Sequence, residues 1–166
     1  KDLKLLNQTR KVDFVFIPKF NDIFENNKKT KIKLNNKDKI LCAKFRENHF
    51  EGVLDVMDRL TNIVKPTKIF MGNKDFQQLI LVKKFLKKKY NTDVVGCKTI
   101  RDKNKIALSS RNYLLSKENL ISASKIIRKL INVKKNIKIK KNKNKYLLTV
   151  KDDFQKQFKV KFEYLE

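Results

Sequence analysis

Short apolar runs along the chain predict strands. The run "VDFVFIP" at 12–18 ends in proline and is typical of a strand buried on both faces of a parallel sheet. The alternating run "TKIKL" at 30–34 predicts a short, half-exposed strand. Two later runs, "TKIFMG" at 67–72 and "TDVVGCKTI" at 92–100, predict two further strands.

Apolar residues that recur every three or four positions predict helices between and after these runs. The first helix covers 49–64 and is ended by Pro66. The second covers 75–89. It is expected to turn six apolar residues inward and three lysines outward: Phe76, Leu79, Ile80, Val82, Phe85 and Leu86, and Lys83, Lys84 and Lys87. Ser116 is the expected N-cap of a further helix near 117–133.

The alternation of strands and helices predicts an α/β fold with a parallel sheet. After residue 145 this order changes, and we expect a strand at 146–150, a short polar helix and a strand at 160–165. The sequence therefore predicts two domains, an α/β domain at 1–114 and a small α+β domain at 115–166.

Positive charge dominates the composition. The chain has 42 Lys and Arg residues against 17 Asp and Glu, a formal net charge of +25. Such a charge is typical of proteins that bind polyanions, but arginine, the usual reader of bases, is scarce here. We therefore favour general lysine enrichment, with a basic nucleic-acid-binding module as the alternative. The dense run "KKNIKIKKNKNK" at 134–145 is expected to be a solvated loop or edge.

The sequence predicts a cytoplasmic protein with no membrane segment. Hydrophobic residues make up 40% of the chain, but no run approaches the roughly 18 apolar residues that a membrane span needs. The opening "KDLKLLNQTRK" has no apolar signal region. Cys42 and Cys97 do not have the spacing of a metal or redox motif, and we expect two reduced, buried thiols.

The first stretch with candidate chemistry is "MGNKD", where a predicted strand ends and a helix begins. Ligands of parallel α/β sheets bind beyond the carboxyl ends of strands. Gly72 permits close approach of a ligand, the following helix offers free N–H groups, and Lys74 can neutralise a phosphate. Asp75 can accept from ribose hydroxyls, and Gln78 lies one turn into the helix. The alternative is a glycine turn with Asp75 as the helix N-cap.

Two further stretches carry polar side chains in loops or at a helix start. In "ALSSRN" at 107–112, two hydroxyls, their N–H groups and Arg111 can form an anion cradle; the alternative is a turn with a serine cap. "RENHFEGV" at 46–53 holds His49, the only histidine of the chain. At a helix start, a histidine is commonly a cap or a packing residue.

Together, in this order, these stretches resemble the pantothenate synthetase family. The family motifs "RPGHFxGV", "GEKDxQQL" and "LSSRN" appear here as "RENHFEGV", "GNKDFQQL" and "LSSRN", with matching flanks "VDFVF", "NIVKP" and "VVG". The resemblance runs from about Lys1 to Leu120 and fades over the last part of the chain.

This resemblance implies a fold and an activity. The family joins pantoate and β-alanine with ATP: pantoate and Mg-ATP give pantoyl adenylate and pyrophosphate, and the amine of β-alanine then displaces AMP. It implies a Rossmann-like nucleotidyltransferase domain, a small C-terminal domain, a cytoplasmic homodimer, Mg²⁺ with the ATP, and no nucleic-acid partner.

The resemblance also implies roles for individual residues. Gln78 would bind pantoate, and Ile100 would contact adenine through its backbone. Lys74 and the "SSR" loop would act on the phosphates as catalytic residues: Lys74, Ser109, Ser110 and Arg111. The full ATP-binding set would be Gly72, Asn73, Lys74, Asp75, Ile100, Leu108, Ser109, Ser110 and Arg111. No residue is assigned as a metal ligand.

Several family features are absent from this sequence. The family's "MGxLHxGH" motif does not occur, so the resemblance predicts a fragment that lacks part of the active site and the C-terminal end. A truncated product without activity is therefore a further alternative. Asn73, Glu47 and Asn48 replace a glutamate, a proline and a glycine of the motifs, and Lys105 replaces a glycine, which is expected to stiffen or shift the second loop.

Overall fold

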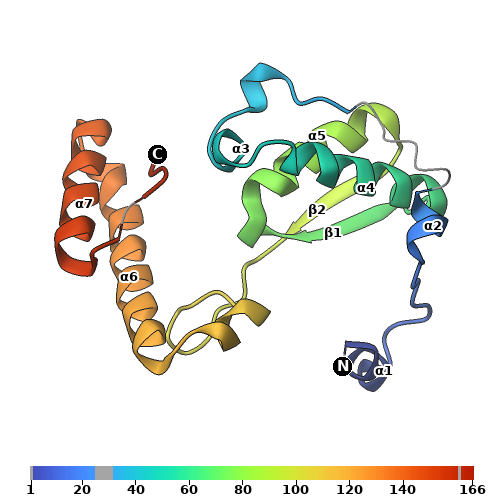
Figure 1. Cartoon of the computed structure of the whole chain (residues 1–166), viewed down its shortest axis with the longest axis horizontal. Coiled ribbons are helices and arrows are strands. Elements are labelled where there is room, and N and C mark those ends of the chain that lie inside the picture. The colour runs from blue at the N-terminus through green and yellow to red at the C-terminus, as the bar shows by residue number, and fades with distance from the viewer. Residues whose placement is uncertain (1, 25–31, 161) are drawn as a thin grey trace.

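A parallel strand–helix–strand unit forms the centre of the first part of the chain (Figure 1). The computed structural model describes residues 2–24, 32–160 and 162–166. Strand β1 (Lys68–Gly72) leads through helix α5 (Phe76–Lys89) to strand β2 (Asp93–Cys97). The strands pair in parallel from Lys68 with Asp93 to Gly72 with Cys97. The expected α/β class and these three elements are confirmed.

Helix α4 (His49–Val64) lies beside α5 on one face of the sheet (Figure 1). It follows Asn48 and is followed by Lys65, both with left-handed backbone at φ 56° and 49°, and Pro66 prevents its continuation. The core between helices and sheet consists of seven buried side chains: Phe50, Leu54, Leu79, Leu81, Val82, Leu86 and Val94.

The expected inward face of α5 is partly wrong. Leu79, Val82 and Leu86 are buried as expected, but Phe76 is 60% exposed and Ile80 is 45% exposed. Leu81, not predicted, is buried instead. The helix packs against both α4 and the sheet, so its buried surface is rotated from the one that spacing alone predicts.

Two predicted strands are absent from the described residues. The segment 12–18 has no strand structure, and Phe14 and Ile17 are 92% and 66% exposed. Of the run at 30–34, residues 32–34 are irregular, and the first two residues lie outside the described part. A strand needs a hydrogen-bonded neighbour, and no described segment pairs with either run.

Smaller helical elements precede or connect the main helices and strands. They are α1 (Asp2–Thr9), α2 (Phe20–Ile23), α3 (Cys42–Phe45), and the 3-10 turns η2 (Asn36–Asp38), η3 (Asn73–Asp75), η4 (Ser110–Leu114) and η5 (Ile137–Ile139).

The last third of the chain is a pair of helices, α6 (Lys117–Asn136) and α7 (Lys143–Phe158) (Figure 1). Ser116 caps α6 as predicted, since its hydroxyl accepts a hydrogen bond from Asn119 N at 3.2 Å. The strand expected at 146–150 is wrong, because this segment belongs to α7. Its buried residues Leu147, Val150 and Phe154 recur at helical spacing. No strand occurs at 160 or 162–166 either.

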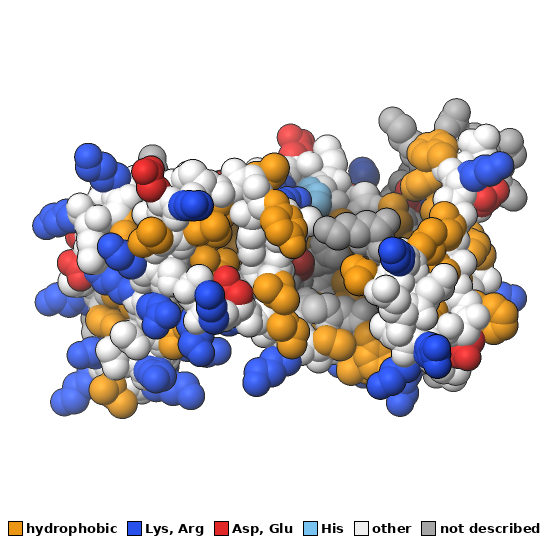
Figure 2. Space-filling model, turned by 90° about the horizontal axis from the view of Figure 1, so that it is seen from below, with side chains coloured by type: hydrophobic (Ala, Val, Ile, Leu, Met, Phe, Trp, Pro, Cys, Tyr) orange, Lys and Arg blue, Asp and Glu red, His pale blue; other side chains and the backbone are white. Residues whose placement is uncertain are grey.

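The lysine-rich run at 134–145 is largely helical rather than a loop. It comprises the end of α6, η5 and the start of α7. Figure 2 shows Lys and Arg side chains along the whole length of the visible face, with few acidic side chains between them. Among the described helices, none is both long and apolar enough to cross a membrane.

Separate clusters of buried apolar residues lie before and after residue 115. The second cluster centres on Val133, Leu147, Val150 and Phe154 in α6 and α7. This separation favours the expected division at 114 and 115, which stays a prediction.

A buried carboxylate connects the two helices of the α/β unit. Asp58 in α4 is 8% exposed and accepts hydrogen bonds from Lys89 Nζ at 2.6 and 2.9 Å and from Tyr90 Oη at 2.7 Å. The hydrogen bond to Asp58 raises the pKa of Lys89. Burial, followed by the bond to Asp58, raises the pKa of Tyr90. Lys89 and Tyr90 therefore both keep their protons at neutral pH and can donate to the carboxylate.

Gly96 in β2 lies where the backbone must approach its neighbours closely. A Cβ at this position would collide with the Asn73 side-chain oxygen and lie 2.9 Å from Leu79 Cδ2. Asn73 therefore lies against the end of β2, and the glycine allows the β1–α5 turn to sit close to the sheet.

Replacement of two glycines by alanine is expected to change stability in opposite directions. In Gly96→Ala, the new methyl group pushes the side chains of Asn73 and Leu79 away from β2. This change should lower the free energy of unfolding by about 1–3 kcal/mol. Gly52→Ala, in α4 with no atom within 4 Å of the new Cβ, should raise it by about 0.5–1 kcal/mol through helix propensity. Urea unfolding at neutral pH measures both changes, and equal effects would contradict the close packing at Gly96.

Candidate active site

A cavity of about 320 Å³ opens beside the turn between β1 and α5. The turn, α3 with its flanks, the start of α4 and the C-terminal tail form its wall. The lining residues are Leu41, Cys42, Arg46, His49, Phe50, Lys74, Asp75, Phe76, Gln77, Gln78 and Tyr164. It thus brings together residues of "RENHFEGV" and "GNKDFQQL", two stretches selected from the sequence.

The β1–α5 turn leaves its charged side chains available to a ligand. Asp75 occupies the N-cap position of α5, but its side chain makes no capping hydrogen bond. Its carboxylate lies 3.9 Å from Lys74 Nζ, and the two side chains are 66% and 40% exposed. Such an exposed pair contributes little to stability. Gly72 has ordinary extended backbone at φ −72°, so the turn does not require a glycine for its conformation.

Arg46 and His49 line the cavity but were not among the expected site residues. His49 is the first residue of α4, and its ring meets the Phe50 ring edge-on at 4.9 Å between centroids. The expectation of a packing residue is thus met in part, but the ring also faces the cavity. The family motif could have indicated both residues, since both belong to "RENHFEGV".

The neighbouring glutamines of "DFQQL" have different surroundings. The Gln77 amide donates to the backbone oxygens of Asp38 and Ile40 at 3.3 and 2.7 Å, and its oxygen accepts from Ala43 N at 3.3 Å. Gln77 therefore holds the segment that carries Leu41 and Cys42 against α5. Gln78 lines the cavity and, among the described residues, has no such side-chain bonds.

Tyr164 reaches the cavity from the C-terminal tail. Its hydroxyl lies 2.6 Å from Cys42 Sγ in a hydrogen bond, and its ring stacks on Phe45 at 6.2 Å between centroids. The bond to Cys42, with burial, raises the pKa of Tyr164 to about 12. The hydroxyl therefore keeps its proton near neutral pH. Local sequence patterns could not indicate this contact, because 122 positions separate the two residues.

The second predicted loop forms a compact hairpin that does not line this cavity. Leu108 N donates to Ile100 O at 3.0 Å, so the residue expected at the adenine lies against the first residue of the expected phosphate loop. Ser109 Oγ accepts from Arg111 N at 3.3 Å, and Ser110 begins η4. Among the described residues, the Arg111 guanidinium has no ion pair or side-chain hydrogen bond. The loop is therefore preformed, with Ser110 and Arg111 exposed and Ser109 half-buried.

Lys105 stands in the hairpin where the family has a glycine. Its backbone is left-handed at φ 69°, a conformation that glycine adopts without strain but that costs other residues roughly 1 kcal/mol. Arg101 offsets part of this cost, since its guanidinium donates to Lys105 O at 3.0 Å. The expectation that Lys105 stiffens or shifts this loop stays a prediction.

The two thiols are less buried than expected. Cys97, at the end of β2, is exposed, and Cys42 is half-buried in the cavity wall. Within the described part of the chain, no three His, Cys, Asp or Glu side chains form a group suited to a metal ion.

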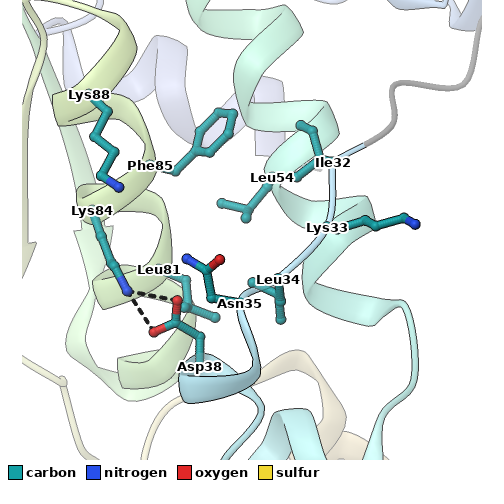
Figure 3. Close-up of a pocket in the computed structure, with 10 residues that line it drawn as sticks. All are labelled: Ile32, Lys33, Leu34, Asn35, Asp38, Leu54, Leu81, Lys84, Phe85 and Lys88. Atoms are coloured by element: carbon teal, nitrogen blue, oxygen red, sulfur yellow. Dashed lines mark hydrogen bonds and ion pairs between the residues drawn. The ribbon is translucent and has the colours of Figure 1, made fainter.

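A smaller cavity of about 210 Å³ lies between α5, α4 and the segment 32–38 (Figure 3). Its lining is Ile32, Lys33, Leu34, Asn35, Asp38, Leu54, Leu81, Lys84, Phe85 and Lys88. Lys84 Nζ bonds both carboxylate oxygens of Asp38 at 2.7 and 2.8 Å. The charges of Lys84 and Asp38 are thus already paired with each other. In the cavity at the β1–α5 turn, by contrast, Lys74 and Asp75 are only weakly paired.

Comparisons with known proteins identify the family. The family model for pantoate-beta-alanine ligase matches residues 1–166. The chain belongs to this family. It is 44% identical over 108 residues to pantothenate synthetase from Endomicrobium trichonymphae, covering 64% of this chain and 38% of that protein. The enzyme from Leptospira interrogans serovar copenhageni is 42% identical over 118 residues, covering 70% and 41%.

Solved structures of the same family share the fold. Pantothenate synthetase from Thermus thermophilus superposes with a TM-score of 0.74 at 30% identity, covering 81% of this chain and 50% of that one. The enzyme from Francisella tularensis, complexed with β-γ ATP and β-alanine, gives 0.70 at 35% identity, covering 75% and 48%. The chain spans about two fifths of the length of the curated relatives described above.

The family resemblance found in the sequence is therefore confirmed. The individual site residues stay predictions, of which Lys74, Asp75 and Gln78 line one cavity. Gly72 and Asn73 directly precede them, while Ile100, Leu108, Ser109, Ser110 and Arg111 belong to the separate hairpin.

The two adjacent glutamines are expected to differ when replaced by alanine. Gln77→Ala removes three hydrogen bonds to the segment 38–43 and should lower the free energy of unfolding by about 1–3 kcal/mol. Gln78→Ala should leave it within about 0.5 kcal/mol. Urea unfolding separates the two variants. Similar losses in both would show that Gln78 also supports the fold.

Proposed function

We propose that this chain forms the ATP- and pantoate-binding part of a pantoate–β-alanine ligase, which makes pantothenate, AMP and pyrophosphate. The observation that carries the proposal is the cavity at the β1–α5 turn. There, in a chain of this family, Arg46 and His49 converge with Lys74, Asp75 and Gln78. The Francisella relative complexed with β-γ ATP and β-alanine supports the same substrates.

The nucleotide and pantoate occupy neighbouring parts of this site in our proposal. Gly72, Asn73, Lys74 and Asp75 hold the nucleotide, and Gln78 binds pantoate. The hairpin supplies the backbone of Ile100 for adenine and Leu108, Ser109, Ser110 and Arg111 for the phosphates. The weak pairing of Lys74 with Asp75 supports this assignment, because the ammonium can move to a phosphate at little cost.

The reaction proceeds in two displacements. A pantoate carboxylate oxygen bonds to the α-phosphorus while the bond to pyrophosphate breaks. The β-alanine amine then attacks the acyl carbon of pantoyl adenylate, loses a proton, and AMP leaves. Negative charge grows on pyrophosphate in the first step, and Lys74 and Arg111 stabilise it. Binding both substrates in line lowers the barrier further.

Mg²⁺ enters this site with ATP in our proposal. Magnesium prefers oxygen ligands and is usually held by one or two carboxylates together with substrate phosphates. Among the described residues lining the cavity, Asp75 is the one carboxylate, and its high exposure leaves it free to contact a hydrated cation. The ion would neutralise charge on the phosphates.

We further propose that the enzyme is a cytoplasmic homodimer and that this chain carries parts of two of its domains, at 1–114 and 115–166. Exposed apolar side chains support a protein contact on the α/β unit. Phe14, Ile17 and Phe70 are 92%, 66% and 67% exposed, and each is an apolar side chain that a partner could cover.

Calorimetric titration of Mg-ATP into the chain at physiological salt tests the nucleotide site. Lys74→Ala and Arg111→Ala should each weaken binding about 10- to 100-fold, since each removes a charge-assisted contact to phosphate. Pantoate should strengthen ATP binding.

Lys83→Ala and Arg128→Ala are the matched controls. They remove the same charges from the exposed faces of α5 and α6 and should change affinity less than about 2-fold. Unchanged affinity in both site variants would overturn the site assignment. Equal weakening in controls and site variants would indicate only non-specific attraction to the net charge.

A further inference from the structure

The C-terminal tail contributes a side chain to a cavity otherwise built by the α/β unit. Phe162 packs edge-on against Phe154 of α7 at 5.1 Å between centroids, and Leu165 joins the same apolar cluster. Tyr164, between them, instead reaches Cys42 and Phe45 at the cavity. Figure 1 shows this end of the chain between the α6–α7 pair and α3. The cavity is therefore completed by both parts of the chain.

The hydroxyl of Tyr164 has a weak partner at present. Thiol sulfur is a poor hydrogen-bond donor and acceptor compared with oxygen, so a ligand oxygen can replace Cys42 Sγ with a gain in bond strength. Stacking on Phe45 holds the ring in place while the hydroxyl changes partner. A tyrosine hydroxyl, with an ordinary pKa of about 10, keeps its proton at neutral pH and can therefore donate a hydrogen bond to that oxygen.

The surroundings of Tyr164 match one class of ligand. The same cavity offers a cation at Arg46, an amide at Gln78, and apolar side chains at Leu41 and Phe50. This combination suits a small aliphatic acid that also carries hydroxyl groups. A triphosphate chain has no apolar surface that could contact Leu41 and Phe50.

We propose that Tyr164 is a specificity residue of the acid-substrate site, donating a hydrogen bond to an oxygen of a small aliphatic hydroxy acid held beside Gln78. This inference rests on the proposed function, which supplies pantoate as an acid of this class. The tail thereby makes acid binding depend on the docking of the α6–α7 part.

Titration of pantoate into the chain with saturating Mg-ATP tests this role. Tyr164→Phe keeps the ring on Phe45 and removes only the hydroxyl. It should weaken pantoate binding about 3- to 10-fold, the loss of one hydrogen bond, with Mg-ATP affinity unchanged. Tyr146→Phe, which removes a hydroxyl within α7, is the matched control and should bind pantoate as the unaltered chain does.

The two cysteines provide a second readout on the same samples. Pantoate should slow the alkylation of Cys42 by iodoacetamide, because it occupies the cavity, and leave that of exposed Cys97 unchanged. In Tyr164→Phe, protection of Cys42 should require about 3- to 10-fold more pantoate.

The outcomes separate this inference from the proposed function. Equal pantoate affinity in Tyr164→Phe and the unaltered chain overturns the role of Tyr164 and leaves the ligase proposal standing. Absence of both ATP and pantoate binding by the unaltered chain overturns both. The inference is supported if Tyr164→Phe binds pantoate more weakly, needs more pantoate to protect Cys42 from alkylation, and leaves the alkylation of Cys97 unchanged.

Discussion

The parallel pairing of β1 and β2 is the constraint on which the site depends. Parallel strands cannot be joined by a tight turn, so the chain must cross over through a helix, here α5. The crossover places the start of α5 beside the carboxyl end of β1, where Lys74, Asp75 and Gln78 line the cavity. The close contact of Asn73 with Gly96 then fixes the turn against the second strand. The topology of the sheet thus places the charged side chains of "GNKD" at the cavity.

Two adjacent glutamines of α5 have different roles: Gln77 supports the wall of the cavity, and Gln78 faces its interior. Both polar groups of the Gln77 amide bond the backbone of 38–43, and these bonds hold the wall that carries Leu41 and Cys42 against α5. Leu41 adopts left-handed backbone at φ 50°, which is unfavourable for a leucine. The bonds from Gln77 to both sides of this residue help to offset that strain. Gln78, one position on, is left for a ligand.

Local patterns predicted the elements whose partners lie nearby in sequence. Helices α4 and α5 and strands β1 and β2 form one continuous unit, and their bounds follow from short-range periodicity. The prediction of strands at 12–18 and 146–150 is wrong because it relied only on the apolar composition of these short runs. The first has no described neighbour to pair with, and in the second Leu147, Val150 and Phe154 follow a helical period that a five-residue window hides. The motifs indicated Lys74, Asp75 and Gln78, but not Tyr164, since only tertiary structure brings the tail to Cys42.

A cavity built by two parts of a chain couples ligand binding to their association. The contact across this junction at Tyr164 is small, one hydrogen bond to a thiol and one stacked ring, which are worth roughly 1 kcal/mol each. A ligand that contacts both walls binds the docked arrangement more tightly than the undocked one, and it stabilises docking by that difference in affinity. In our proposal, the weak direct contact has a function. If the tail were firmly docked without ligand, ligand binding could shift the docking equilibrium only slightly. In our proposal, Tyr164 of the tail docks most firmly against α3 when the acid site is filled.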